Sequence, residues 1–222
     1  MTTTAITPVD NSALLAEFSG GSSTDVSMMI GIGLVKDSDA VFFQYIGENG
    51  EPHALVLPSG KPLSRMQNVA LAGISVAENV GEFNATKLNL FLETSSGRTV
   101  LLTSGLGTIW SQCVITGLIA MLDGGDVTCP FNLDTWKGNS KMRPCFAALR
   151  VGQTKVSDND TYEQLREARS ADDEAKILQI MRDAVQILSH AIKPESVDVA
   201  VSSEVAAALA PAEKTVEVPA DF

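Results

Sequence analysis

The hydrophobic pattern between residues 69 and 155 changes its period twice, and this restricts the possible folds more than any other feature of the chain. Short alternating or apolar runs predict three strands, at 69–77, 87–94 and 98–103. Helical spacing follows at 107–122, where apolar residues recur at Ile115, Leu118, Ile119 and Leu122. Two further strands are predicted at 126–131 and 144–155. The expected order is therefore three strands, one helix and two strands.

The flanking segments differ from this region. Three more short apolar runs predict N-terminal strands at 27–36, 40–46 and 53–57, so residues 26–155 are expected to form one β-rich domain. Residues 1–25 end in the Gly- and Ser-rich stretch SGGSSTD and are interpreted as a flexible arm. Residues 195–222 are rich in Ala, Ser and Pro and are expected to form a disordered acidic tail.

Residues 156–194 are expected to be helical. Capping-box spacing predicts helix starts at Asp160 and Ser170. An apolar stripe then runs along the second helix, through Ile177, Met181, Ala184, Val185, Leu188 and Ile192. This stripe predicts an amphipathic helix with one buried face.

Charge is unevenly distributed along the chain, whose formal net charge is −11. Residues 156–222 hold 6 Lys or Arg and 14 Asp or Glu, whereas 135–155 hold 5 cations and no acid. This basic strip permits a polyanionic partner in spite of the acidic total. No apolar run approaches the roughly 20 residues of a membrane span, and no secretory signal is recognisable. The 3 widely spaced cysteines are expected to be reduced thiols of a cytoplasmic protein.

The order of elements in 69–155 and the end of the chain together resemble bacterial and phage single-stranded DNA-binding proteins. That family shares this order, which forms an OB-fold, a five-stranded Greek-key barrel. It also shares a basic, aromatic-bearing loop between strands four and five and an acidic tail that ends in Phe. The resemblance implies a mainly β fold with added helices (α+β): an OB-like barrel with extra N-terminal strands and a C-terminal amphipathic helix. It further implies a homo-oligomer that recruits replication, recombination or repair proteins through Asp221 and Phe222.

Alternation in the predicted strand at 87–94 indicates which side chains face outward. One face carries Leu88, Leu90 and Leu92 and is expected to belong to the core. The opposite face carries Lys87 and Phe91. Phe91 is either a stacking platform for bases or a ring covered by the N-terminal strands, and the sequence leaves both interpretations open.

The same alternation in CFAALRV places Phe146 and Arg150 on the outer face of the last strand. In single-strand binding sites, aromatic rings stack on bases and cations contact phosphates. Eight residues are therefore predicted to bind nucleic acid, four of them in a basic loop before this strand: Lys87, Phe91, Trp136, Lys137, Lys141, Arg143, Phe146 and Arg150. The alternative for the loop is a solvated turn with one Trp folded back on the barrel.

Sequence motifs for catalysis are weak. Neither His53 nor His190 has a cysteine partner at the spacing of a zinc site. The stretch SGLGT lacks the Lys of a P-loop, and no GxSxG motif occurs. A non-enzymatic single-stranded DNA-binding protein is therefore favoured, with DNA preferred to RNA and with no cofactor, metal or membrane partner. The alternative is a structural or protein-interaction module, for instance a virion or assembly component, that oligomerises through its β surface and C-terminal helix.

Overall fold

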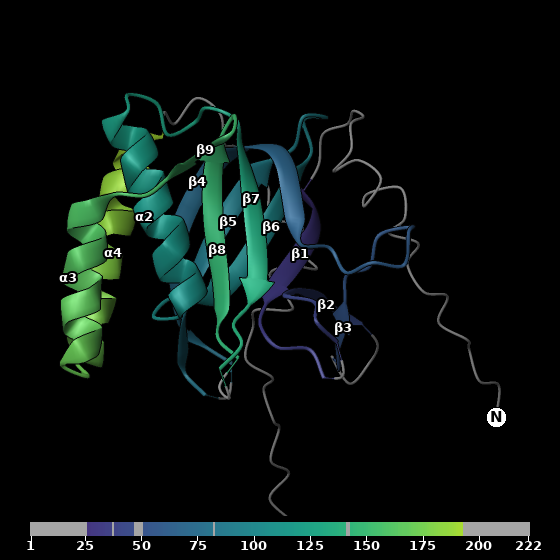
Figure 1. Ribbon diagram of the computed structural model, residues 1–222, viewed down its shortest axis with the longest axis horizontal. Helices are drawn as coiled ribbons and strands as arrows, with labels where there is room; N and C mark the ends of the chain where they lie inside the picture. Colours follow the sequence, from purple (N-terminus) through teal and green to yellow (C-terminus); the bar gives the residue numbers. More distant parts are fainter. Residues whose placement is uncertain (1–25, 37, 47–50, 82, 141–142, 193–222) are drawn as a thin grey trace, which may run out of the picture.

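The structure is a computed structural model and describes residues 26–36, 38–46, 51–81, 83–140 and 143–192. These residues form a mixed α+β fold with one nine-stranded, mostly antiparallel sheet and three helices (Figure 1). The strands are β1 (Val26–Ile32), β2 (Phe42–Ile46), β3 (Glu51–Ala54), β4 (Arg65–Val80), β5 (Ala85–Glu93), β6 (Thr99–Gly105), β7 (Phe131–Lys137), β8 (Cys145–Val151) and β9 (Thr154–Val156). The helices are α2 (Ile109–Asp123), α3 (Asn159–Ser170) and α4 (Glu174–Ala191). None of these described helices is long and apolar enough to cross a lipid bilayer.

The sheet has the order β3-β2-β1-β6-β5-β4-β7-β8-β9, and within it β1 and β6 are the parallel pair. The long strand β4 lies between β5 and β7 in this order, and it pairs with each of them along a different part of its length. Its first residues, from Arg65 to Val69, pair with β7, and residues from Ala70 onward pair with β5. Asn68, with a φ of 57°, lies where the partners change, and the register is irregular there. Such irregularities bend and twist a strand, and in Figure 1 β7 and β8 pass in front of β5 and β6.

The predicted OB-like barrel is not confirmed, because the described sheet is open. The five predicted strands occur in the continuous order β6-β5-β4-β7-β8, so a closed barrel would require β6 to pair with β8. Instead β6 pairs with β1, and β8 pairs with β9. The N-terminal strands therefore extend the sheet at the edge where closure would occur.

The expected position of the fourth strand of the barrel, 126–131, is wrong. Residues 127–130 form no strand: a turn occupies 127–128, and the Asp126 carboxylate accepts hydrogen bonds from the amide and the hydroxyl of Thr128, at 2.8 and 2.6 Å. Strand β7 begins only at Phe131, after Pro130. Trp136 and Lys137 consequently belong to the end of a strand and not to the predicted loop.

The core lies on the concave side of the bent sheet, against which α2, α3 and α4 pack, and we call the opposite side the convex face. The members of the core include the row predicted from alternation, Leu88, Leu90 and Leu92, which is buried as expected. Trp110 of α2 is buried in the same cluster, and Gly117 lets the helix approach β8 closely. A Cβ at Gly117 would lie 3.0 Å from the Cβ of Leu149. This close contact packs α2 directly onto the strand that carries Phe146 and Arg150.

The predicted amphipathic helix is confirmed as α4, and its whole apolar stripe is buried: Ile177, Met181, Ala184, Val185, Leu188 and Ile192. In Figure 1, α3 and α4 lie beside α2, on one side of the sheet. Arg182 of α4 also pairs with Glu78 near the end of β4, at 3.0 Å. The helices start at slightly different residues from those predicted, because the N-caps are Asp158 and Asp173 and not Asp160 and Ser170.

Removal of the α3 cap should measurably lower stability. The Asp158 carboxylate accepts a hydrogen bond from the Thr161 amide at 2.6 Å. This bond, helped by the Thr161 hydroxyl and the Asp160 amide, outweighs partial burial and holds the pKa of Asp158 below its usual range. We expect Asp158→Ala to reduce the free energy of unfolding by about 1 kcal/mol at neutral pH, as is typical of N-cap loss.

The pH dependence of this effect has a defined sign. A lowered folded-state pKa means that the ionised cap stabilises the fold above the unfolded pKa, about 3.9 for Asp. This contribution disappears as the pH falls through the folded pKa. Urea unfolding of wild type and Asp158→Ala should therefore give a difference at pH 7 that shrinks below about pH 4. Asp160→Ala is the control. If it lowers the free energy of unfolding more than Asp158→Ala does, then Asp160, and not Asp158, caps the helix.

Candidate nucleic-acid interface

Two aromatic rings lie stacked on the convex face of β7 and β8. Trp136 and Phe146 are opposite each other in the strand register, and their ring centroids are 5.9 Å apart with planes inclined by 15°. Trp136 is 45% exposed, and Phe146 is half-buried beneath it. A Cβ at Gly138 would lie 2.8 Å from the Phe146 ring, so the glycine makes room for it. The predicted outward direction of Phe146 is consistent with this arrangement.

An open groove of about 740 Å³ begins at Trp136. Its charged lining consists of three cations and one acid: Lys61, Lys137, Arg143 and Asp39. The Lys137 ammonium donates a hydrogen bond to the Ser38 carbonyl, and Arg143 forms a 2.7 Å ion pair with the exposed Asp39. The groove is therefore cationic with an aromatic ring at its side. Lys61, which comes from a turn before β4, was not predicted as a site residue.

A second cationic feature lies on the same face, two residues from Trp136 along β7. The carboxylate of Asp134 accepts hydrogen bonds from Arg65 of β4 and from Arg150 of β8. Partial burial raises the pKa of Asp134, but the hydrogen bonds and charges of both arginines outweigh it and hold this pKa below its usual range. The prediction that Arg150 faces outward agrees with this geometry. Arg65 was missed, because the predicted strand begins at residue 69.

Phe91 lies on a different part of the convex face. Its ring covers Gly73 of β4, where a Cβ would lie 3.2 Å from Cδ2 of Phe91. In the register, Phe91 is opposite both Gly73 and Leu101, and Leu101 is opposite Met29 of β1. These residues form an apolar row across four strands. Strand β1 is thus a neighbour of β6 within the sheet, and not a second layer over Phe91.

The two aromatic surfaces are separate. Arg65 is opposite Asp134 and Gly73 is opposite Phe91, so eight residues of β4 separate the two points. At about 3.3 Å per residue, this is roughly 25 Å of extended chain. Lys87 belongs to the second surface, where it is opposite Gly105 at the end of β6. The structure therefore brings together Trp136, Lys137, Arg143, Phe146 and Arg150, and it places Lys87 and Phe91 elsewhere.

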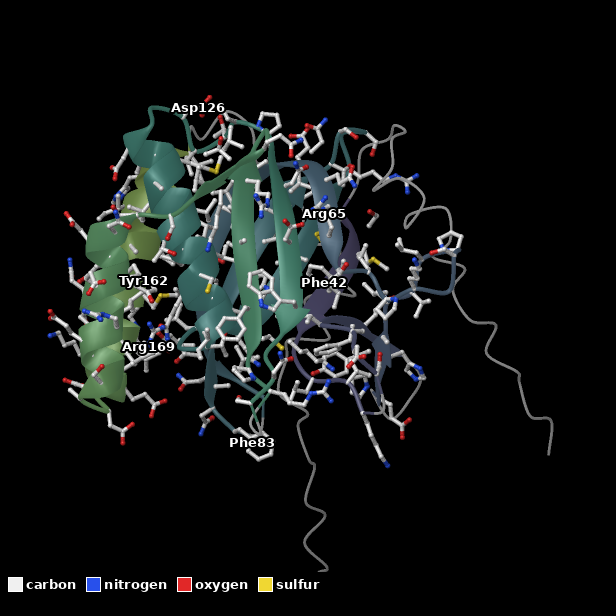
Figure 2. The ribbon with its side chains drawn as sticks, in the orientation of Figure 1. Phe42, Arg65, Phe83, Asp126, Tyr162 and Arg169 are labelled. Carbon is white, nitrogen blue, oxygen red and sulfur yellow. The ribbon has the colours of Figure 1, made fainter. Side chains whose placement is uncertain are left out.

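Three predicted site residues lie outside the described residues: Lys141, Asp221 and Phe222. Their roles in nucleic-acid and partner binding stay predictions. Another exposed ring was missed by sequence reasoning: Phe83, in the turn between β4 and β5, is 91% exposed and points away from the body in Figure 2. In the sequence, the sign of this exposed ring is a large apolar residue within the polar turn GEFN.

Two of the thiols, those of Cys129 and Cys145, are not activated. A hydrogen bond to Asp126 raises the pKa of Cys129, and burial raises the pKa of Cys145 in spite of the nearby Lys137. Both side chains are therefore held in the protonated form near neutral pH. Within the described ranges, no group of three His, Cys, Asp or Glu side chains is placed to hold a metal ion.

Comparisons of this chain with protein-family models, with curated proteins and with solved structures found no match.

Proposed function

We propose that this chain is a cytoplasmic, non-enzymatic protein that binds single-stranded nucleic acid, with DNA preferred to RNA, in replication, recombination or repair. The observation that carries the proposal is the exposed Trp136 ring, stacked on Phe146, at the side of a groove lined by Lys61, Lys137 and Arg143. Exposed rings stack on any base, and cations beside them neutralise phosphates. This combination favours a single strand, whose bases are free to stack, over a duplex.

The order of elements supports the same proposal. The strands β6-β5-β4-β7-β8, with α2 between β6 and β7, follow the order of an OB-fold, although the sheet is open. OB-folds bind oligonucleotides with the loops between strands one and two and between strands four and five. The corresponding positions here are the β4–β5 turn with Phe83 and the β7–β8 connection that lines the groove. An OB-like fold adapted by N-terminal strands is therefore part of the proposal.

Binding should depend steeply on salt and little on sequence. If four or five cations of this face, among them Lys61, Lys137, Arg143 and Arg150, each meet one phosphate, a plot of log K against log salt should have a slope of about −3 to −3.5, since single strands release roughly 0.7 counterion per contact. Titration of the protein with oligo(dT), followed by quenching of tryptophan fluorescence at several salt concentrations, measures this slope. A flat titration at low salt, or equal affinity for a blunt duplex, would contradict the proposed function.

A protein-interaction role is the second candidate, and the apolar row around Phe91 favours it. Met29 and Phe91 are half-buried on the convex face, on either side of the buried Leu101, so each leaves part of its apolar surface open. Such a row on a sheet face suits contact with a second copy of the chain, as in an assembly component or a homo-oligomer. If oligo(dT) does not bind, a concentration-dependent mass in sedimentation that Phe91→Glu abolishes would support this role.

A further inference from the structure

One carboxylate joins two arginines that come from strands far apart in the sequence. Arg65 donates to Asp134 through both Nε and a terminal nitrogen, the latter at 3.1 Å to Oδ2. Arg150 donates from Nε to the same Oδ2 at 3.0 Å. The side chain of Asp134 is 16% exposed, whereas those of Arg65 and Arg150 are 51% and 38% exposed. The acid is therefore mostly covered, and the cations remain open to solvent.

Both guanidinium groups retain donors for a ligand. Each guanidinium has five N–H donors. Among the described residues, Arg65 uses two of them, both to Asp134. Arg150 also uses two, one to Asp134 and one to the Gln153 carbonyl at 3.2 Å. The trio carries a net charge of +1. Arginine forks match the geometry of phosphate oxygens and bind them through paired hydrogen bonds.

The trio also lies at a useful distance from the stacked rings. Asp134 and Trp136 point to the same face of β7, two residues apart, which is about 7 Å in a strand. Lys155 of β9 is opposite Arg150 and adds a further exposed cation to this side. A nucleotide whose base stacks on Trp136 can thus place a neighbouring phosphate against the arginines.

We propose that Arg65 and Arg150, held in position by Asp134, form a phosphodiester-binding site on the convex face of β4, β7 and β8. This site rests on the proposed function, since it binds the backbone of the strand whose bases stack on Trp136. Asp134 is a positioning residue. It does not contact the phosphate, and it fixes the direction in which the free N–H groups of both arginines point.

The sign of one substitution separates positioning from simple charge. Asp134→Asn removes a negative charge beside the strand, so charge alone predicts tighter binding. Loss of positioning predicts the opposite, because two long side chains become free to rotate. We expect Asp134→Asn to weaken oligo(dT) binding about 3- to 10-fold and to make the salt slope shallower by roughly 0.7 to 1.4, the equivalent of one or two lost phosphate contacts.

Glu163→Gln is the matched control, because Glu163 also pairs with an arginine, Arg166, but both lie on α3, away from the groove and from the trio. It makes the same chemical change, and its affinity for oligo(dT) should stay the same or rise. Arg65→Gln and Arg150→Gln should each reduce the slope by about 0.7. Circular dichroism and thermal melting check that each variant is folded, and the two arginine variants decide the question if Asp134→Asn does not fold.

The outcomes distinguish this site from the proposed function as a whole. If wild type binds oligo(dT) and Asp134→Asn binds it equally or more tightly with an unchanged slope, the site is overturned and the proposed function stands. The site is likewise overturned if Arg65→Gln leaves affinity and slope unaltered. If wild type does not bind at all, the proposed function is overturned, and this site with it.

Discussion

Replacing Trp136 by alanine is expected to weaken the binding of oligo(dT) by about 1 to 3 kcal/mol, the usual value of one base–aromatic stack. This corresponds to a loss of affinity of roughly 5- to 150-fold. The ring is 45% exposed, stacks on Phe146 and borders the cationic groove, so its removal takes away a contact surface and little of the core. Anisotropy of a fluorescently labelled oligonucleotide measures the change, because this method does not need the lost tryptophan.

Two control variants make the result specific. Trp136→Phe keeps a ring that can stack and should retain most of the affinity. Tyr162→Ala removes a ring that is also 45% exposed but lies on α3, on the helical side of the molecule (Figure 2). Its affinity should equal that of wild type. Equal losses from Trp136→Ala and Tyr162→Ala would mean that the stacked pair is not a binding surface.

Leu149→Ala should have the largest effect on stability, a loss of about 2 to 5 kcal/mol in the free energy of unfolding. Leu149 is fully buried on the concave side of β8 and contacts α2 at Gly117, a position without a side chain that could fill the space. Truncation therefore removes apolar contacts and leaves a cavity between the helix and the sheet. Urea unfolding followed by circular dichroism measures the loss.

Val151→Ala is the matched control on the same strand. Val151 points to the same side as Leu149 but is 39% exposed, so its truncation should cost within about 0.5 kcal/mol, as for most surface changes. Similar losses at the two positions would show that α2 does not depend on its contact with β8.

Local periodicity predicted much of this fold from the sequence. The alternation of Leu88, Leu90 and Leu92 identified the buried face of β5, and the stripe from Ile177 to Ile192 identified the buried face of α4. The order of three strands, a helix and two strands was also predicted. These features depend on the spacing of neighbouring residues, which the sequence displays directly.

Other features depend on contacts between distant residues and were missed. Turn chemistry at Asp126 displaced the start of β7, and the two-partner pairing of β4 brought Arg65 beside Asp134. The separation of Phe91 from Trp136 has the same origin, because the bend in β4 decides which parts of the convex face are adjacent. Periodicity within a strand shows its two faces but does not show its neighbours.

The parallel pairing of β1 with β6 has a consequence for the order of folding. Val26 is opposite Thr99, so about seventy residues must be closed into a loop before this ladder can form, whereas β4, β5 and β6 are joined by short turns. Contacts of long sequence separation form late, because the entropy of loop closure is lost before any contact compensates it. We expect the outer edge of β6 to expose unpaired backbone groups during that interval, as a template for strands of other chains. The N-terminal strands therefore act in the finished molecule as a permanent cover for an edge that is vulnerable while the chain folds.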